Sequence, residues 1–103
     1  MKVKLLKISF EKWCIHAESH ILENGFYENG FSLKDYHVEF DGDVNVEEDE
    51  GIDITLERIF DAFNLGKVDE DLYSSATDIY VLNSGMWYVD EFGFSKVNEE
   101  MSA

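Results

Sequence analysis

Basic residues are scarce in this 103-residue chain, which has 8 Lys+Arg against 23 Asp+Glu and a formal charge of −15. Proteins that bind DNA, RNA or anionic membranes through charge present a basic face to them. The composition therefore argues against direct binding to these polyanions and favours a basic protein partner. Solubility alone requires a smaller net charge, because a magnitude of about 2–8 suffices for a small domain.

Cysteine, proline and long apolar runs are also scarce or missing. Cys14 is the only cysteine, so the chain has no internal disulfide, and a single thiol suits a reducing, cytoplasmic compartment. No apolar run approaches the ~20 residues of a membrane-spanning helix. The N-terminal stretch MKVKLLKISF is too short and too charged for a secretory signal. The sequence contains no proline.

The composition nevertheless supports a folded core. Hydrophobic residues make up 45% of the chain and aromatic residues 15%, with 8 phenylalanines, whereas disordered chains contain few such residues. At this length one domain is expected, and it buries roughly two-thirds of its unfolded surface. We expect a single domain over residues 1–97 and a disordered tail over residues 98–103.

Two elements are predicted near the N-terminus. Alternation over Lys2–Ile8 predicts a strand, and its slip at Leu5–Leu6 indicates a bulge or burial on both faces. Residues 9–23 favour a helix capped by Ser9. A strand is the alternative, because alternate residues from Trp13 are also apolar, but no turn residue separates this segment from the first strand. The helical face would contain Phe10, Trp13, Cys14, Ala17 and Ile21.

A hairpin and a second helix are predicted in the middle of the chain. Tyr36–Phe40 and Val44–Val46 alternate apolar and polar residues on either side of Asp41-Gly42, a hairpin turn signal. The helix that follows is expected to be capped by Asp53 or Thr55 and to end at Gly66. Its buried stripe is expected to contain Leu56, Ile59, Phe60 and Phe63.

The C-terminal part predicts a second hairpin, with strands Thr77–Leu82 and Met86–Glu91 around Asn83-Ser84-Gly85. Residues 92–97 are expected to prolong its second strand past a bulge at Gly93. Both faces would be apolar, one with Ile79, Val81, Trp87 and Val89, the other with Tyr80, Leu82, Met86 and Tyr88. The element order predicts an α+β fold, a small antiparallel sheet with two helices packed on one face.

The residues after Phe40 partly match a calcium-binding loop but lack two of its required residues. Asp41–Asn45 opens like an EF-hand loop. Such a loop needs Gly at its sixth position for a sharp turn and a bidentate Glu at its twelfth. Val46 and Ile52 occupy these positions, so we expect no calcium loop of this type.

Zinc binding and nucleophilic catalysis are equally incomplete. His16 and His20 have the i, i+4 spacing of a zinc pair, with His37 and Cys14 as further candidates, but neither HExxH nor CxxC occurs. Cys14 falls on the apolar helical face, and Ser84 lies in a hairpin turn rather than a nucleophile elbow. We therefore expect no enzyme, no metal site and no cofactor.

The acidic residues are the feature that points to a function. They concentrate in Glu39–Asp53, where no Lys or Arg interrupts them, and again at Asp69–Asp71. Same-face side chains of a strand repeat about every 7 Å, close to every second phosphate of a DNA strand at ~3.4 Å per phosphate. A solvated surface loop without a partner is the alternative. The predicted partner-binding residues are Asp41, Asp43, Glu47, Glu48, Asp49, Glu50, Asp69, Glu70 and Asp71.

In length, acidity, absence of proline and clustering of Asp41–Asp53 and Asp69–Asp71, the chain resembles the small phage-encoded DNA mimics, which include anti-CRISPR proteins. The resemblance implies a non-enzymatic inhibitor that occupies the basic nucleic-acid-binding surface of a Cas nuclease. The same profile fits immunity proteins that neutralise basic nuclease toxins. A different class of function would be a homo-oligomerising structural module that uses the aromatic hairpin Ile79–Phe94, with the charge serving solubility.

Overall fold

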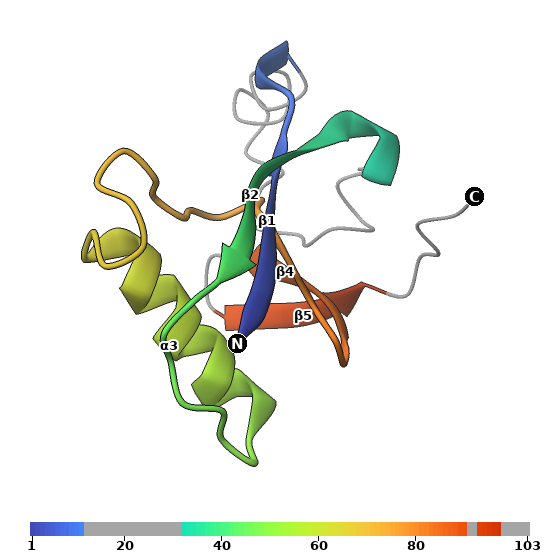
Figure 1. The fold of residues 1–103 in the computed structure, drawn as a ribbon. Helices are drawn as coiled ribbons and strands as arrows, with labels where there is room; N and C mark the ends of the chain where they lie inside the picture. The colour runs from blue at the N-terminus through green and yellow to red at the C-terminus, as the bar shows by residue number, and fades with distance from the viewer. Residues whose placement is uncertain (12–31, 91–92, 98–103) are drawn as a thin grey trace.

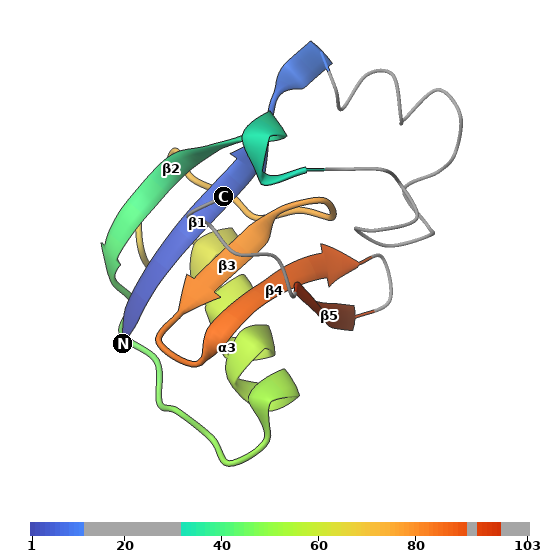
Figure 2. The ribbon, with the colours of Figure 1, turned by 90° about the vertical axis from the view of Figure 1, so that its right-hand side faces the viewer.

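The computed structural model describes residues 1–11, 32–90 and 93–97. These residues form a five-stranded antiparallel sheet in the order β2-β1-β3-β4-β5, with one α-helix, α3, across one face (Figures 1 and 2). This confirms the α+β class. The elements are β1 (Lys2–Ile8), the 3-10 helix η2 (Leu33–Asp35), β2 (Tyr36–Asp43), α3 (Ile52–Asn64), β3 (Ile79–Leu82), β4 (Gly85–Asp90) and β5 (Gly93–Val97).

The sequence predicted two helices on one face, and the described residues contain one complete α-helix, α3, while Phe10 and Glu11 are helical as well. The first expected helix, residues 9–23, lies outside the described residues from position 12 onward, as does the expected tail over 98–103. No helix in the described ranges is long and apolar enough to cross a bilayer.

Strand β1 contributes to two cores because a bulge changes its pairing. Its register with β2 shifts between Leu5 and Leu6, which face Phe40 and Val38, so that Glu39 of β2 is the extra residue. Leu5 belongs to the cluster under α3, whereas Leu6 belongs to the cluster on the other face of the sheet. The predicted slip at Leu5–Leu6, with burial on both faces, is therefore confirmed.

Helix α3 packs on the sheet through an aromatic contact chain. Phe63 is fully buried, meets Phe40 of β2 edge-on at 5.5 Å between ring centroids, and stacks on Tyr80 of β3 at 6.1 Å. Leu56 and Ile59 are buried on the same helix face, as the spacing predicted, and Phe60 is partly buried there. These contacts hold the apolar face of α3 against the sheet.

The two ends of α3 differ in how their backbone groups are satisfied. The N-cap is Gly51 and has no side-chain cap, so the expected caps at Asp53 or Thr55 are wrong. Gly66 follows the C-terminus with φ 71°, as expected of a helix-ending glycine. The N–H of Gly66 donates to Phe63 and that of Lys67 to Ala62, which satisfies two terminal carbonyls in a Schellman motif.

The expected hairpin turn at Asp41-Gly42 does not form, and Val44–Val46 is not a return strand. Residues 36–43 form one continuous strand, which pairs along β1 from Ile8↔Tyr36 to Lys2↔Asp43. Long-range pairing with β1 has overridden the local turn preference of Asp-Gly. The chain after Asp43 leads into α3 instead.

The C-terminal hairpin forms, but its side chains are divided between the two faces of the sheet differently from the prediction. The two-residue turn pairs Leu82 with Gly85, so Tyr80 lies opposite Trp87, and Ile79 opposite Tyr88. Directly opposed residues share a face. Tyr80, Leu82, Trp87 and Val89 therefore face α3, and Ile79, Met86, Tyr88 and Val97 the other core.

Residues 93–97 are also placed differently from the expectation. They do not prolong β4 past a bulge. Asp90 lies opposite Gly93 and Met86 opposite Val97, so the chain has reversed direction and β5 forms the edge of the sheet beside β4.

The aromatic contact chain provides a stability prediction. Phe63→Ala removes a fully buried ring that touches Phe40 and Tyr80, so we expect the free energy of unfolding to fall by about 3–5 kcal/mol. Urea denaturation measures it. Leu65→Ala is the control, since Leu65 is exposed and adjacent to the same helix end, and its change should stay within about 0.5 kcal/mol. Equal effects of the two substitutions would contradict this packing.

Candidate functional site

Two of the predicted partner-binding carboxylates lie on strand β2 beside lysines. Asp41 is paired in register with Lys4 of β1, and Asp43 with Lys2, and all four side chains are exposed. Opposite charges at directly opposed positions attract each other across an antiparallel pair. This part of the acidic sequence is therefore partly compensated by the N-terminal lysines.

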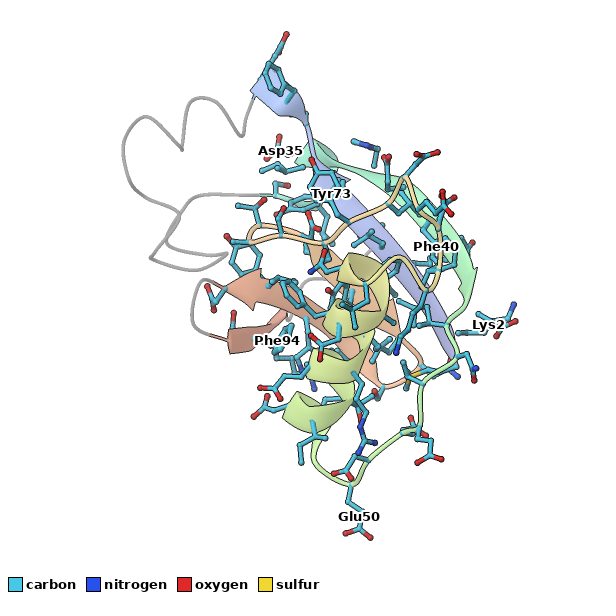
Figure 3. All side chains as sticks on the ribbon, turned by 90° about the vertical axis from the view of Figure 1, so that its left-hand side faces the viewer. Lys2, Asp35, Phe40, Glu50, Tyr73 and Phe94 are labelled. Carbon is cyan, nitrogen blue, oxygen red and sulfur yellow. The ribbon has the colours of Figure 1, made fainter. Side chains whose placement is uncertain are left out.

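The loop that enters α3 contains several of the predicted carboxylates. Glu47, Glu48 and Glu50 are exposed, and within the described residues none of them forms an ion pair with Lys or Arg. Arg58 donates to the backbone carbonyl of Glu47 at 2.9 Å rather than to its side chain. Figure 3 shows Glu50 projecting at one end of the molecule, beyond the start of the helix.

Asp49 has a structural position in this loop. It is half-buried, and its carboxylate accepts the Gly51 N–H at 2.9 Å and lies 3.9 Å from Arg58. Its backbone N–H donates to the Thr55 hydroxyl at 2.8 Å. Asp49 and Thr55 thus hold the loop against the first turn of α3, which fixes the direction in which its neighbours point.

Helix α3 adds carboxylates that the sequence analysis did not assign to the site. Asp53, Glu57 and Asp61 are exposed on the helix. Their i, i+4, i+8 spacing places them on one helix face. The signal was present in the sequence, because these positions interleave with the buried stripe that contains Leu56 and Phe63. They extend the exposed carboxylates of the loop along the outside of the helix.

The remaining predicted residues, Asp69–Asp71, lie beyond the other end of α3. All three are exposed, and the Asp69 carboxylate accepts the Asp71 N–H at 2.9 Å in a local turn. A 13-residue helix is about 20 Å long, so this group is separate from the loop at Glu50. Val68 and Leu72, on either side of this group, pack against the hydrophobic cluster under α3.

The nine predicted residues therefore form three groups rather than one line. Asp41 and Asp43 lie on β2 beside lysines, residues 47–50 lie in the loop before α3, and residues 69–71 lie after it. The loop group joins the carboxylates of α3. We use the name acidic surface for the exposed residues Glu47, Glu48, Glu50, Asp53, Glu57 and Asp61.

A pocket of about 580 Å³ opens on the helix side of the sheet, where β1 and β2 meet the chain before β3. This pocket was not predicted from the sequence. Its volume lies within the ~300–1,000 Å³ of small-ligand sites. Figure 3 shows Tyr73 near this end of the molecule, away from Glu50. Its lining residues are Lys7, Ile8, Phe10, His37, Glu39, Tyr73, Ser75, Thr77 and Asp78.

A buried carboxylate forms the floor of the pocket. Asp78 is 2% exposed, and its Oδ2 accepts from the Lys7 ammonium at 2.9 Å and from the Ser75 N–H at 3.0 Å. Ser74 donates to the same oxygen at 3.2 Å and shares a further hydrogen bond with the Tyr80 hydroxyl. Burial raises the pKa of Asp78 above its ordinary value, while the nearby Lys7 acts in the opposite direction.

Backbone strain accompanies this network. Thr77 has φ 85°, a left-handed conformation that costs a β-branched residue about 1–3 kcal/mol. Its carbonyl accepts from the Tyr36 hydroxyl at 2.5 Å and its N–H donates to Val89 at 2.9 Å. Burial raises the pKa of Tyr36, so that its phenol stays protonated and remains a donor. These contacts hold the strained turn in place.

This network could not be predicted from the sequence. Lys7 and Asp78 are 71 residues apart in the chain, and Lys7 falls in a strand whose other lysines are exposed. The one available signal was Asp78 itself, a charged residue directly before the apolar strand Ile79–Leu82. Because the Lys7 ammonium pairs with the Asp78 carboxylate, this carboxylate has a structural role and is not a free acid or base.

Comparison with known protein families, with curated proteins and with solved structures finds no match to this chain.

The pH dependence of stability tests the environment of Asp78. Because its pKa is raised above 3.8, the folded chain retains this proton at a pH where the unfolded chain has lost it. The associated stabilisation is complete below the unfolded pKa and is lost as pH rises through the folded value. We expect the unfolding free energy of the wild type, relative to Asp78→Asn, to fall from about pH 4 upward. A pH-independent difference in urea denaturation would contradict this.

Proposed function

We propose that the protein is a non-enzymatic inhibitor that binds the basic nucleic-acid-binding surface of a nuclease through its acidic surface. The observation that supports this proposal is the set of exposed carboxylates in the loop before α3 and along the outside of the helix, none of which forms an ion pair within the described residues. Within the described residues, Arg58 is the one basic side chain that ion-pairs in this region, and it does so with Asp49. Repulsion among the others lowers stability, so a cationic partner would relieve it.

The spacing of the carboxylates suits such a partner. Residues four apart on a helix advance about 6 Å along its axis, so Asp53, Glu57 and Asp61 form a row of negative charges. One strand of DNA carries a phosphate about every 3.4 Å of axis. The row therefore approximates every second phosphate, as the sequence-based argument required, but on a helix rather than on a hairpin.

Exposed apolar side chains lie beside these charges. Ile54 is 46% exposed and Ile52 36%, and both belong to the first turn of α3 between Glu50 and Glu57. Interfaces that bind tightly combine a small desolvated apolar centre with a charged rim that steers the encounter. The acidic surface has both parts, which favours a protein partner over adventitious cation binding.

The alternative of a homo-oligomerising module is less well supported. It relied on the aromatic C-terminal hairpin as a contact surface. Tyr80, Trp87 and Tyr88 of that hairpin are 0–8% exposed and belong to the two cores. An immunity protein against a nuclease toxin uses the same chemistry as the proposal and differs only in the identity of the basic partner.

The proposal is tested by inhibition of purified Cas nucleases and basic nuclease toxins, assayed as cleavage of duplex DNA. We expect inhibition that duplex DNA competes away and that weakens strongly between about 50 and 300 mM salt, because exposed charges are screened. Inhibition that is insensitive to both salt and competing DNA would contradict a charge-based mimic.

A matched pair of variants locates the binding surface. Glu48→Gln/Glu50→Gln and Asp41→Asn/Asp43→Asn each remove two negative charges, but only the second pair lies opposite lysines. We expect the first double variant to lose at least about tenfold in affinity, and the second to lose less, since its charges are partly compensated. Equal losses would show that net charge alone matters and that the position of the acidic surface does not.

A further inference from the structure

The pocket above Asp78 has aromatic and acidic groups at its opening. Tyr73 is 63% exposed and Phe10 77% exposed, and both line the cavity. Glu39 lines it from β2, with its Oε2 2.9 Å from His37 Nε2. A mouth built from aromatic faces and a carboxylate is the usual chemistry of sites that recognise organic cations.

The charges of the lining residues favour a cation over an anion. Lys7 and Asp78 neutralise each other across 2.9 Å. With His37 counted as neutral, Glu39 leaves the lining with one net negative charge. The surrounding chain carries −15, and the summed field of a protein raises the local concentration of oppositely charged ligands.

Tyr73 already accepts a cation on one side of its ring. The Lys7 ammonium lies 4.6 Å from the ring centroid, within the ~6 Å range of a cation–π contact. The exposure of Tyr73 leaves much of its remaining surface open to solvent. A planar cation from a ligand can therefore stack on the ring in addition to the Lys7 ammonium, without displacing Lys7 from Asp78.

We propose that this pocket binds the guanidinium group of an arginine side chain supplied by the basic partner, an inference that rests on the proposed function. Arginine suits the pocket better than lysine because its flat guanidinium stacks on an aromatic ring and donates two parallel hydrogen bonds to one carboxylate. Tyr73 supplies the ring and Glu39 the carboxylate. The network of Lys7, Ser74, Thr77 and Asp78 fixes the floor on which they are arranged.

The position of the pocket is consistent with this role. Asp69–Asp71 precede Tyr73 by a few residues and are exposed on the same loop. They lie two to four residues before the pocket-lining Tyr73 and add negative charge to the loop that carries it. The partner would thus be held at the acidic surface and positioned by one arginine in the pocket.

An NMR titration of the intact protein tests the site without a partner. The probe is N-acetyl-L-arginine amide, and the control is N-acetyl-L-citrulline amide, which has nearly the same shape and no charge. We expect saturable amide shifts at Tyr73, Ser75, Thr77 and Glu39 with the arginine probe alone. No saturable shift, equal shifts with citrulline, or shifts confined to residues 47–50 would overturn the proposal.

Variants of exposed residues separate the pocket from general charge. Tyr73→Ala and Glu39→Gln should each weaken arginine binding about threefold or more. Glu48→Gln removes the same charge as Glu39→Gln outside the pocket and should leave the affinity for N-acetyl-L-arginine amide unchanged. Equal weakening by Glu39→Gln and Glu48→Gln, or unchanged affinity in Tyr73→Ala, would overturn the site.

The outcomes for the two proposals are distinguishable. If nucleases are inhibited through the acidic surface but the arginine probe does not bind, the pocket assignment fails and the proposed function stands. If the probe binds at Tyr73 and Glu39 but no nuclease is inhibited, the guanidinium site stands as a property of the fold, and the claim that a nuclease supplies the arginine fails.

Discussion

The packing of α3 on the sheet is the constraint on which the rest of the structure depends. A chain with a formal charge of −15 folds only if apolar burial outweighs the repulsion among its carboxylates. Phe63 provides this link, because its ring joins α3 to Phe40 of β2 and to Tyr80 of β3. With the apolar stripe directed at the sheet, the acidic residues of the helix have no position available except the outer surface.

The same packing separates two regions that could contact a partner. The loop held by Asp49 and Thr55 lies at the start of the helix and presents exposed glutamates. The pocket above Asp78 lies at the far end, where the Lys7 ion pair and the strained Thr77 build a fixed floor. In the proposed function, a rigid helix between a charged surface and an aromatic pocket would let one partner be attracted by the first and oriented by the second.

Local patterns predicted the elements of this fold better than they predicted its pairings. The strand at Lys2–Ile8, its slip at Leu5–Leu6 and the buried stripe of α3 follow from side-chain periodicity alone. The prediction of a turn at Asp41-Gly42 was wrong because pairing with β1 along the whole of β2 outweighs a local turn preference. The pocket at Asp78 could not be predicted, since its ion pair joins residues that only the folded sheet brings together.

The central claim is that the carboxylates of the acidic surface are exposed and that, within the described residues, none of them forms an ion pair. The most direct measurement is the salt dependence of the free energy of unfolding at neutral pH, with sodium chloride raised from about 20 to 300 mM. Uncompensated repulsion predicts that screening stabilises the protein, so the urea midpoint should rise with salt. A midpoint that falls with salt would show that attractive ion pairs dominate the surface, and would contradict the account.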